Sequence, residues 1–317
     1  MTRKNPDRTS SRMQVMSISN VHCSFQGDNR MTMAVAFRVC KITIVFAILL
    51  SVGSSAFSKE PIAPTGATEA KAAWFQRSLV GLEVGPTGSQ FGSSSKDTGF
   101  AVRFNGGGIA RATKGAGAEY LVIWAREGDW AFYDSTLQPK PPGLGSRGVL
   151  REAVDAGRQL GLPIIAYCQV QYPGHALREH PDWRMVDKDG KPIDGRVCYR
   201  SGYLEYMKQM VEEHLAYGID GFHLDMVDQG FGPPHGCWCP TCQQEFLIQY
   251  DMPMPKDLAW DEKRDDVLEF RYASSERFEQ ELAAHIHRVD PRATVDYNYH
   301  GAIGRRVASA TSHNIAC

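Results

Sequence analysis

The chain has 317 residues, of which 43% are hydrophobic, and its formal net charge is −1. This composition is typical of a globular protein with enough apolar residues for one sizeable core. A charge balance near zero argues against nucleic acid and against an acidic membrane surface as partners. The composition therefore excludes two classes of partner and leaves the function to local motifs.

The N-terminal region has the pattern of an export signal. Residues 1–32 are polar and lack hydrophobic periodicity, which indicates a disordered leader or a start codon assigned upstream of the true one. Residues 33–56 combine basic residues, a short apolar run and small residues, as a signal peptide does. The run is shorter than the roughly 20 residues of a permanent membrane span, and a buried core helix is the alternative. We expect an exported protein, periplasmic or secreted, with a linker over 57–77 and no permanent span in the mature chain.

Apolar runs alternate with helical patterns from residue 78 onward, which indicates βαβ units and a parallel sheet. Helices are recognised by apolar positions at a period of 3.6 residues and strands by short runs with period-2 alternation. In chain order we expect strand 79–84, helix 109–116, strand 120–124, helix 149–160, strand 163–170, a long loop over 175–190, helix 204–215 with Ser201 as N-cap, a strand from Gly218 to Asp225, helices 239–250 and 267–289, and strand 293–300.

This succession of elements predicts the α/β class and a (β/α)8 TIM barrel, in which the chemistry lies on the loops after the strands. A doubly wound open sheet is the alternative, but Gly106, Gly107 and Gly108 do not match the glycine fingerprint usual after its first strand. The sequence shows only five of the eight strands of such a barrel. We therefore expect a partial barrel over 78–301, truncated after about five βα units, and an irregular tail over 302–317.

The strand that follows Gly218 contains the strongest candidate for chemistry. Alternation places Phe222 and Leu224 on one face and His223 with Asp225 on the other. Asp225 then stands at the carboxyl end of a buried parallel strand, where barrels carry their catalytic residues. The alternative interpretation is an aspartate that caps the next turn or pairs with a neighbouring cation.

Three thiols lie within six residues in the sequence Cys237-Trp-Cys239-Pro-Thr-Cys242. Cysteines two or three residues apart seldom form disulfides, so the spacing favours a tetrahedral thiolate site for a structural zinc. Cys198, in the loop after the third predicted strand, is the expected fourth ligand, and His235 is the alternative. Free or disulfide-bonded cysteines are the competing interpretation, because export permits disulfides.

Four segments in this order resemble the bacterial family called hypothetical glycosyl hydrolase six: 117–126, 218–226 (Gly-Ile-Asp-Gly-Phe-His-Leu-Asp-Met), 237–243 and 296–300. That family is similar to α-L-fucosidases in its first four strands, and its cysteine loop is similar to the zinc cluster of bacterial β-galactosidases. The resemblance implies a glycoside hydrolase-like barrel with a carbohydrate substrate. It also implies that Asp225 is the nucleophile and that Cys198 completes the zinc site.

Glycoside cleavage requires a second carboxyl group, roughly 5 to 5.5 Å from the first for retention and 6.5 to 9.5 Å for inversion. Glu127, Asp129 and Asp296 lie at predicted strand ends and are candidates for this group or for sugar contacts. Further candidate sugar contacts, by hydrogen bonding or stacking, are Trp124, Gln169, His223, Asp228, Asn298 and His300. The sequence thus predicts an exported, retaining glycoside hydrolase; a non-catalytic carbohydrate-binding or interaction protein on a degenerate, truncated barrel is the alternative.

Overall fold

The computed structural model describes residues 74–86, 99–227, 236–257 and 262–298. All of them belong to one compact unit of the chain, residues 61–317. The predictions of a leader, an export signal and an irregular tail concern residues outside these ranges. No helix among the described residues is long and apolar enough to cross a membrane.

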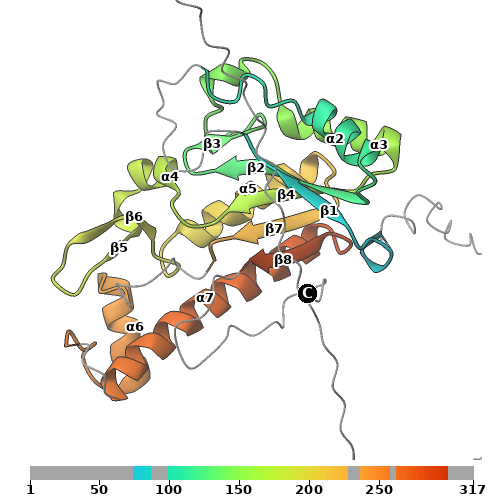
Figure 1. Cartoon of the computed structure of the whole chain (residues 1–317). Coiled ribbons are helices and arrows are strands. Elements are labelled where there is room, and N and C mark those ends of the chain that lie inside the picture. Colours follow the sequence, from blue (N-terminus) through green and yellow to red (C-terminus); the bar gives the residue numbers. More distant parts are fainter. Residues whose placement is uncertain (1–73, 87–98, 228–235, 258–261, 299–317) are drawn as a thin grey trace, which may run out of the picture. The chain divides into compact units, whose positions relative to one another are not determined.

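A parallel sheet forms the centre of the described unit (Figure 1). Its strands pair in the order in which they occur along the chain, and a short strand β3 (Trp130–Ala131) adds antiparallel to the end of β2. A doubly wound sheet reverses its strand order at a switch point, whereas barrel strands follow one another. The described strands therefore contradict the doubly wound alternative. They are β1 (Gly81–Val84), β2 (Tyr120–Glu127), β4 (Ile164–Gln169), β7 (Gly221–Asp225) and β8 (Thr294–Asn298).

Helices cover one face of this sheet and bury the main core. Helices α2 (Gly106–Gly115) and α3 (Val149–Leu160) pack against each other and against β2, and α5 (Tyr203–Ala216) packs against α7 (Glu262–Val289). Phe222 on β7 is fully buried in this core, as the alternation predicted. The face that carries Phe222 thus belongs to the core, and the polar residues lie on the opposite face of the sheet.

Two helices show how the local sequence sets their bounds. Helix α3 has the predicted bounds, and it ends because Gly161 adopts a left-handed conformation with φ of 59°. Helix α2 begins in a glycine run because the Asn105 side chain accepts a hydrogen bond from Gly108 N. A Cβ at Gly106 would lie 2.0 Å from the Val149 carbonyl oxygen, so the close approach of α2 to α3 requires glycine there.

The predicted loop over 175–190 is wrong. That segment forms α4 (Gly174–Glu179), a 3-10 turn (Pro181–Trp183) and an antiparallel hairpin of β5 (Arg184–Val186) and β6 (Pro192–Val197). These elements are short and half-exposed, so they carry no hydrophobic period that a sequence can reveal. The N-cap of α5 also differs from the prediction, because Gly202 occupies that position while Ser201 accepts from Tyr203 N and donates to the Cys198 carbonyl.

A second, smaller core lies apart from the main one. It joins the β5–β6 hairpin, helix α6 (Pro240–Tyr250) and part of α7. Its buried members include the four cysteines predicted to bind zinc, together with Met185, Trp238, Phe246, Met254, Val267 and Phe270. The cysteines therefore occupy the centre of this second core.

Candidate active site and cysteine cluster

The polar face of the sheet carries a row of side chains that crosses four strands. The strand register aligns Trp124 on β2, Tyr167 on β4, His223 on β7 and Asp296 on β8. The rings of Trp124 and Tyr167 stack at 4.5 Å with an interplanar angle of 9°. His223 Nδ1 lies 2.6 Å from Asp296 Oδ2. Alternation along each strand brings these residues to one face, so the row lies directly below the position of Asp225.

Asp225 ends β7, and three hydrogen-bond donors hold its carboxylate. Tyr167 Oη donates to Oδ2 at 2.6 Å, Asn298 Nδ2 donates to Oδ1 at 2.9 Å, and Met226 N donates to Oδ1 at 2.8 Å. The donors come from β4, from β8 and from the backbone directly after β7. Asp225 is 8% exposed, so these contacts fix the plane of a buried carboxylate. We call Asp225 and its three donors the Asp225 site.

The backbone turns sharply after this carboxylate. Met226 has a φ of 59°, a left-handed conformation that is uncommon for a residue with a side chain. Such conformations persist only where surrounding contacts hold them, and they cluster at functional sites. Gln169 Nε2 lies 3.5 Å from Met226 Sδ, and Tyr199 Oη lies 3.4 Å from the Met226 carbonyl oxygen. The turn therefore has contacts from two other segments.

Two groups in the row have shifted pKa values. Burial, followed by the charge of Asp225, raises the pKa of Tyr167, so its hydroxyl stays protonated and donates at neutral pH. Burial opposes protonation of His223, but the hydrogen bond and the charge of Asp296 outweigh burial and raise its pKa. The row therefore presents a donor to Asp225 and a histidine that favours its charged form.

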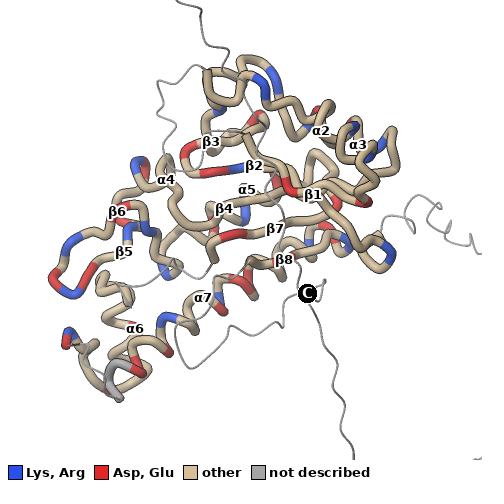
Figure 2. The backbone as a smooth tube through the Cα atoms, viewed as in Figure 1, with Lys and Arg blue, Asp and Glu red and all other residues tan. Residues whose placement is uncertain are grey.

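The three candidate second carboxylates differ in their surroundings. Asp129 forms an ion pair with Arg178 at 2.9 Å, and Asp296 contacts His223. Glu127 is 5% exposed at the end of β2, and its charge contributes to the shifted pKa of Tyr167. Figure 2 shows acidic positions at the ends of both β2 and β7. Because β2, β4 and β7 are parallel, Glu127 at the end of β2 lies at the same edge of the sheet as Asp225 at the end of β7.

Three predicted sugar contacts have partners within the chain. Gln169 accepts a hydrogen bond from Gly128 N at 2.8 Å, and the Asn298 amide nitrogen donates to Asp225. Trp124 stacks on Tyr167 with one face, and a Cβ at Gly85 would lie 2.5 Å from its indole ring. Contact of these three residues with a sugar stays a prediction. The predicted contacts Asp228 and His300 lie outside the described residues.

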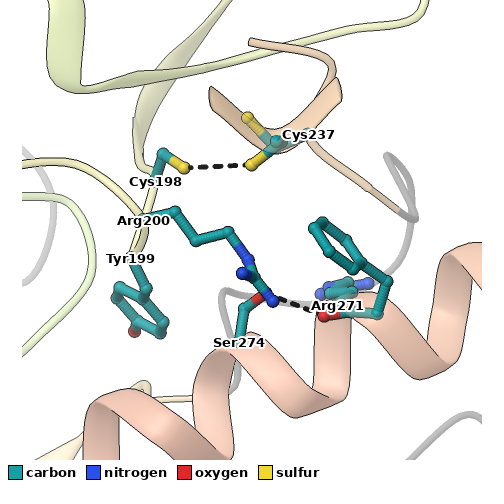
Figure 3. A pocket seen from close by; sticks show the side chains of 8 residues that line it. Cys198, Tyr199, Arg200, Cys237, Arg271 and Ser274 are labelled. Atoms are coloured by element: carbon teal, nitrogen blue, oxygen red, sulfur yellow. Dashed lines mark hydrogen bonds between the residues drawn. The ribbon is translucent and has the colours of Figure 1, made fainter. Parts of the chain in front are cut away.

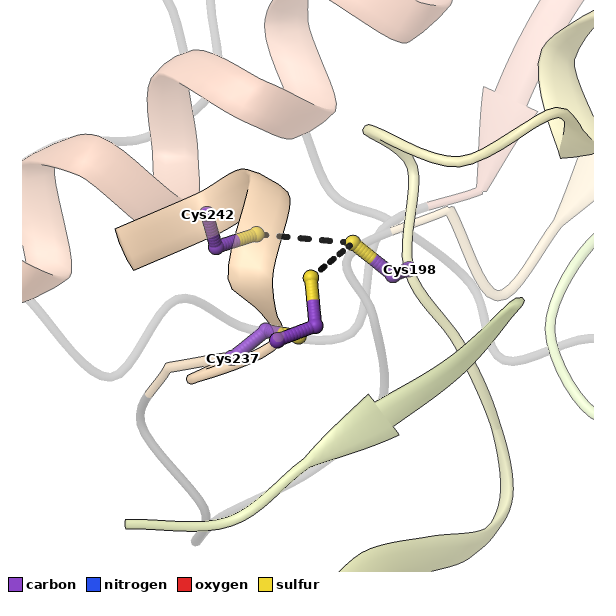
Figure 4. A group of neighbouring side chains, drawn as sticks. Cys198, Cys237 and Cys242 are labelled. Atoms are coloured by element: carbon purple, nitrogen blue, oxygen red, sulfur yellow. Dashed lines mark hydrogen bonds between the residues drawn. The ribbon is translucent and has the colours of Figure 1, made fainter. Parts of the chain in front are cut away.

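The four cysteines Cys198, Cys237, Cys239 and Cys242, which we call the cysteine cluster, come together although Cys198 lies far from the other three in sequence (Figure 4). Their sulfur atoms all lie within 4.8 Å of one another, and all four residues are buried. Cys198 Sγ lies 3.5 Å from Cys242 Sγ and 3.9 Å from Cys239 Sγ. None of the four is in a disulfide.

These distances allow a test of whether the cluster fits zinc. A tetrahedral zinc with sulfur ligands at about 2.3 Å separates the sulfurs by about 3.8 Å. The two measured separations, 3.5 and 3.9 Å, lie on either side of this value. The donor set and its spacing therefore fit a tetrathiolate zinc site.

Sequence reasoning missed Tyr167 and Arg200. Tyr167 shares the alternating face of β4 with Gln169, and that alternation is a signal from which it could have been found. Arg200 follows Cys198 by two residues, and its side chain lies beside the cysteine cluster. No sequence period marks an arginine in an irregular segment.

Residues 105–226 match the model of the family described as hypothetical glycosyl hydrolase 6. The predicted family resemblance is confirmed. None of the curated proteins compared with the chain matches it.

Solved glycosidase structures have a similar fold. The α-L-fucosidase isoenzyme 2 from Paenibacillus thiaminolyticus superposes with a TM-score of 0.53 at 19% identity, over 68% of this chain and 32% of that one. The β-galactosidase from the psychrophilic Marinomonas ef1 has a TM-score of 0.47 at 14% identity, over 69% of this chain and 37% of that one. The chain thus spans about a third of the length of the fucosidase. The likeness to the fucosidase fold, with the parallel strand order, confirms the predicted α/β barrel class, and the chain is glycoside hydrolase-like in family model and fold.

Proposed function

We propose that the chain supplies the nucleophile of a retaining glycoside hydrolase and that Asp225 is this nucleophile. The observation that carries the proposal is the Asp225 site, a carboxylate at the carboxyl end of a barrel strand with donors from β4, from β8 and from the following turn. Barrel enzymes carry their catalytic groups at this end of the sheet. A carboxylate whose plane is fixed attacks with little reorganisation.

The chemistry requires two bonds to change in each step. A carboxylate oxygen of Asp225 forms a bond to the anomeric carbon while the glycosidic carbon–oxygen bond breaks, and the leaving oxygen receives a proton from a general acid. In the second step, water attacks the same carbon while the bond between that carbon and Asp225 breaks. The water gives a proton to the residue that acted as general acid in the first step, which we call the second residue. Glu127 is our first candidate for the second residue, because it is buried at the end of β2 and its charge acts on Tyr167.

Substitution Asp225→Asn tests this proposal. We would assay the purified chain with nitrophenyl glycosides, starting with the α-L-fucoside and the β-D-galactoside. We expect Asp225→Asn to lower kcat by several orders of magnitude with an unchanged melting temperature, and azide to restore turnover as a glycosyl azide. The control is Asp155→Asn, which removes a 53% exposed acid of α3 that pairs with Arg151, outside the Asp225 site.

Two results would contradict the nucleophile assignment or the enzyme class. Unchanged turnover in Asp225→Asn would move the nucleophile elsewhere, with Asp296 and Glu127 as the next variants. A wild-type chain that binds oligosaccharides in calorimetry but cleaves none of them would support the non-catalytic carbohydrate-binding alternative.

We also propose that the cysteine cluster holds one structural zinc ion. Four thiolates leave no open coordination position for water, so the ion would stabilise the second core rather than take part in catalysis. Elemental analysis should find one zinc per chain, and Cys239→Ser should lose it. Cys168→Ser is the matched control, because Cys168 is a free, buried cysteine of the main core. Disulfides among the four cysteines in non-reducing mass mapping would contradict the proposal.

A further inference from the structure

A small cavity of about 10 Å³ lies beside the cysteine cluster (Figure 3). Cys198, Cys237 and Cys242 line it, and so do two arginines, Arg200 and Arg271. The cavity has room for about one water molecule, so it is not a site for an organic ligand. Its lining nevertheless brings two arginine side chains next to the proposed metal ligands.

The net charge of the metal centre gives these arginines a role. Four thiolates around a divalent zinc ion carry a net charge of about −2. The four cysteines are between 3% and 8% exposed, so water can offset little of this charge. A buried charge without a counter-charge is strongly unfavourable. The proposed site therefore needs positive charge close to the sulfur atoms.

Contacts on several sides fix the guanidinium of Arg200. Its Nε donates to Ser274 Oγ at 2.7 Å, its Nη1 pairs with Glu245, and its Cζ lies 3.9 Å above the ring of Phe270. The Arg200 side chain is 7% exposed, whereas that of Glu245 is 34% exposed. Arg200 thus lies on the buried side of its ion pair, toward the cysteines, and Glu245 lies toward solvent.

The same segment of chain carries a metal ligand and this cation. Cys198 and Arg200 are two residues apart, and Figure 3 shows Arg200 extending from the loop of Cys198 toward Ser274. Arg200, Cys198 and Cys242 line the same cavity.

We propose that Arg200 is a positioning residue of the metal centre, and that its guanidinium, together with that of Arg271, offsets the negative charge of the zinc tetrathiolate and so raises the affinity for zinc. The inference rests on the proposed zinc site. The competing role for Arg200 is purely structural, as a link between α6 and α7 through Glu245 and Ser274.

Zinc affinity separates the two roles. We would measure the affinity of the purified chain by competition with a chromophoric chelator at fixed pH and ionic strength. Residues that contact metal ligands from outside typically change metal affinity by about 10- to 100-fold, and we expect a loss of this size in Arg200→Gln. Arg200→Lys should lose less, because lysine keeps the charge but not the planar fork.

Arg277→Gln is the matched control. Arg277 also lies near Glu245, at 3.6 Å, but its side chain is 47% exposed and does not line the cavity. We expect its zinc affinity to equal that of the wild type. Cobalt substitution adds a second measurement, since the thiolate-to-cobalt absorption band should shift in Arg200→Gln and not in Arg277→Gln.

The outcomes distinguish this inference from the zinc proposal itself. Equal zinc affinity in the wild type and Arg200→Gln would overturn the role of Arg200 and leave the zinc site intact. A wild-type chain that binds no zinc would overturn both. If Arg200→Gln does not fold, Arg271→Gln replaces it, and wild-type affinity in that variant would overturn the shared charge compensation.

Discussion

The Asp225 site and the cysteine cluster are organised by different means. Asp225 and its donor Asn298 end two neighbouring parallel strands, and its donor Tyr167 lies within β4 on the other side of β7; backbone hydrogen bonds set the register of all three strands. Three of the cysteines precede or begin α6, and Cys198 follows the β5–β6 hairpin, so no shared ladder aligns them. The sheet therefore positions the carboxylate through its backbone ladder, whereas the cysteines come from separate segments that the proposed zinc ion would hold together.

The apolar cores next to the two sites also differ, in size and in the elements that form them. The main core extends under β2, β4, β7 and β8, so the Asp225 site rests on packing contributed by several helices. The second core consists of the cysteines and a few apolar residues around them. A small core of this kind rarely supplies enough stabilisation alone, which is why small domains often contain metals or disulfides.

Removal of the proposed zinc ion should produce the largest difference between the two regions. Structural zinc contributes about 10 to 16 kcal/mol of apparent binding free energy in small zinc domains. We expect a strong chelator to abolish hydrogen-exchange protection in α6 and the β5–β6 hairpin while β2 and β4 keep theirs. Equal loss of protection in β4 would show that both cores unfold as one cooperative unit.

Substitution Tyr167→Phe should have the next largest effect, confined to the Asp225 site. It removes the donor to Asp225 Oδ2 and leaves a buried carboxylate oxygen without its partner. We expect the free energy of unfolding in urea to fall by about 1 to 3 kcal/mol, with unchanged zinc content. Tyr172→Phe is the control, because its half-buried ring follows the same strand. A change in zinc affinity in Tyr167→Phe would show that the two regions are coupled.

The smallest expected effect is a pH dependence within the sheet. The folded pKa of His223 is raised above its unfolded value of about 6.5. The contribution of the His223–Asp296 pair to stability is therefore fully present below about pH 6.5 and is lost as the pH rises through the folded pKa. Urea unfolding at pH 6 and pH 9 should show this loss in the wild type and a smaller loss in Asp296→Asn. Identical pH dependence in the two proteins would assign the effect to other groups.

The sequence predicted correctly those features that depend on neighbouring residues, such as the bounds of α3 and the two faces of β7. The apolar spacing of Val149–Leu160 and the glycine after it determined α3 to the residue. Alternation predicted that Phe222 faces the core and that Asp225 lies on the opposite face with His223, and the register confirms both. The β5–β6 hairpin was not predicted because its strands are short and pack in the second core rather than in the main parallel sheet.

The sequence by itself determined the period of each element, the strand that ends at Asp225 and the close spacing of three cysteines, because these depend on residues within a few positions of one another. Only the tertiary structure decided that Tyr167 and Asn298 donate to Asp225, that Trp124 stacks on Tyr167, and that Arg200 lies beside Cys198 and its partners. Strand order and the approach of loops depend on packing between segments far apart along the chain, and local patterns do not encode that packing.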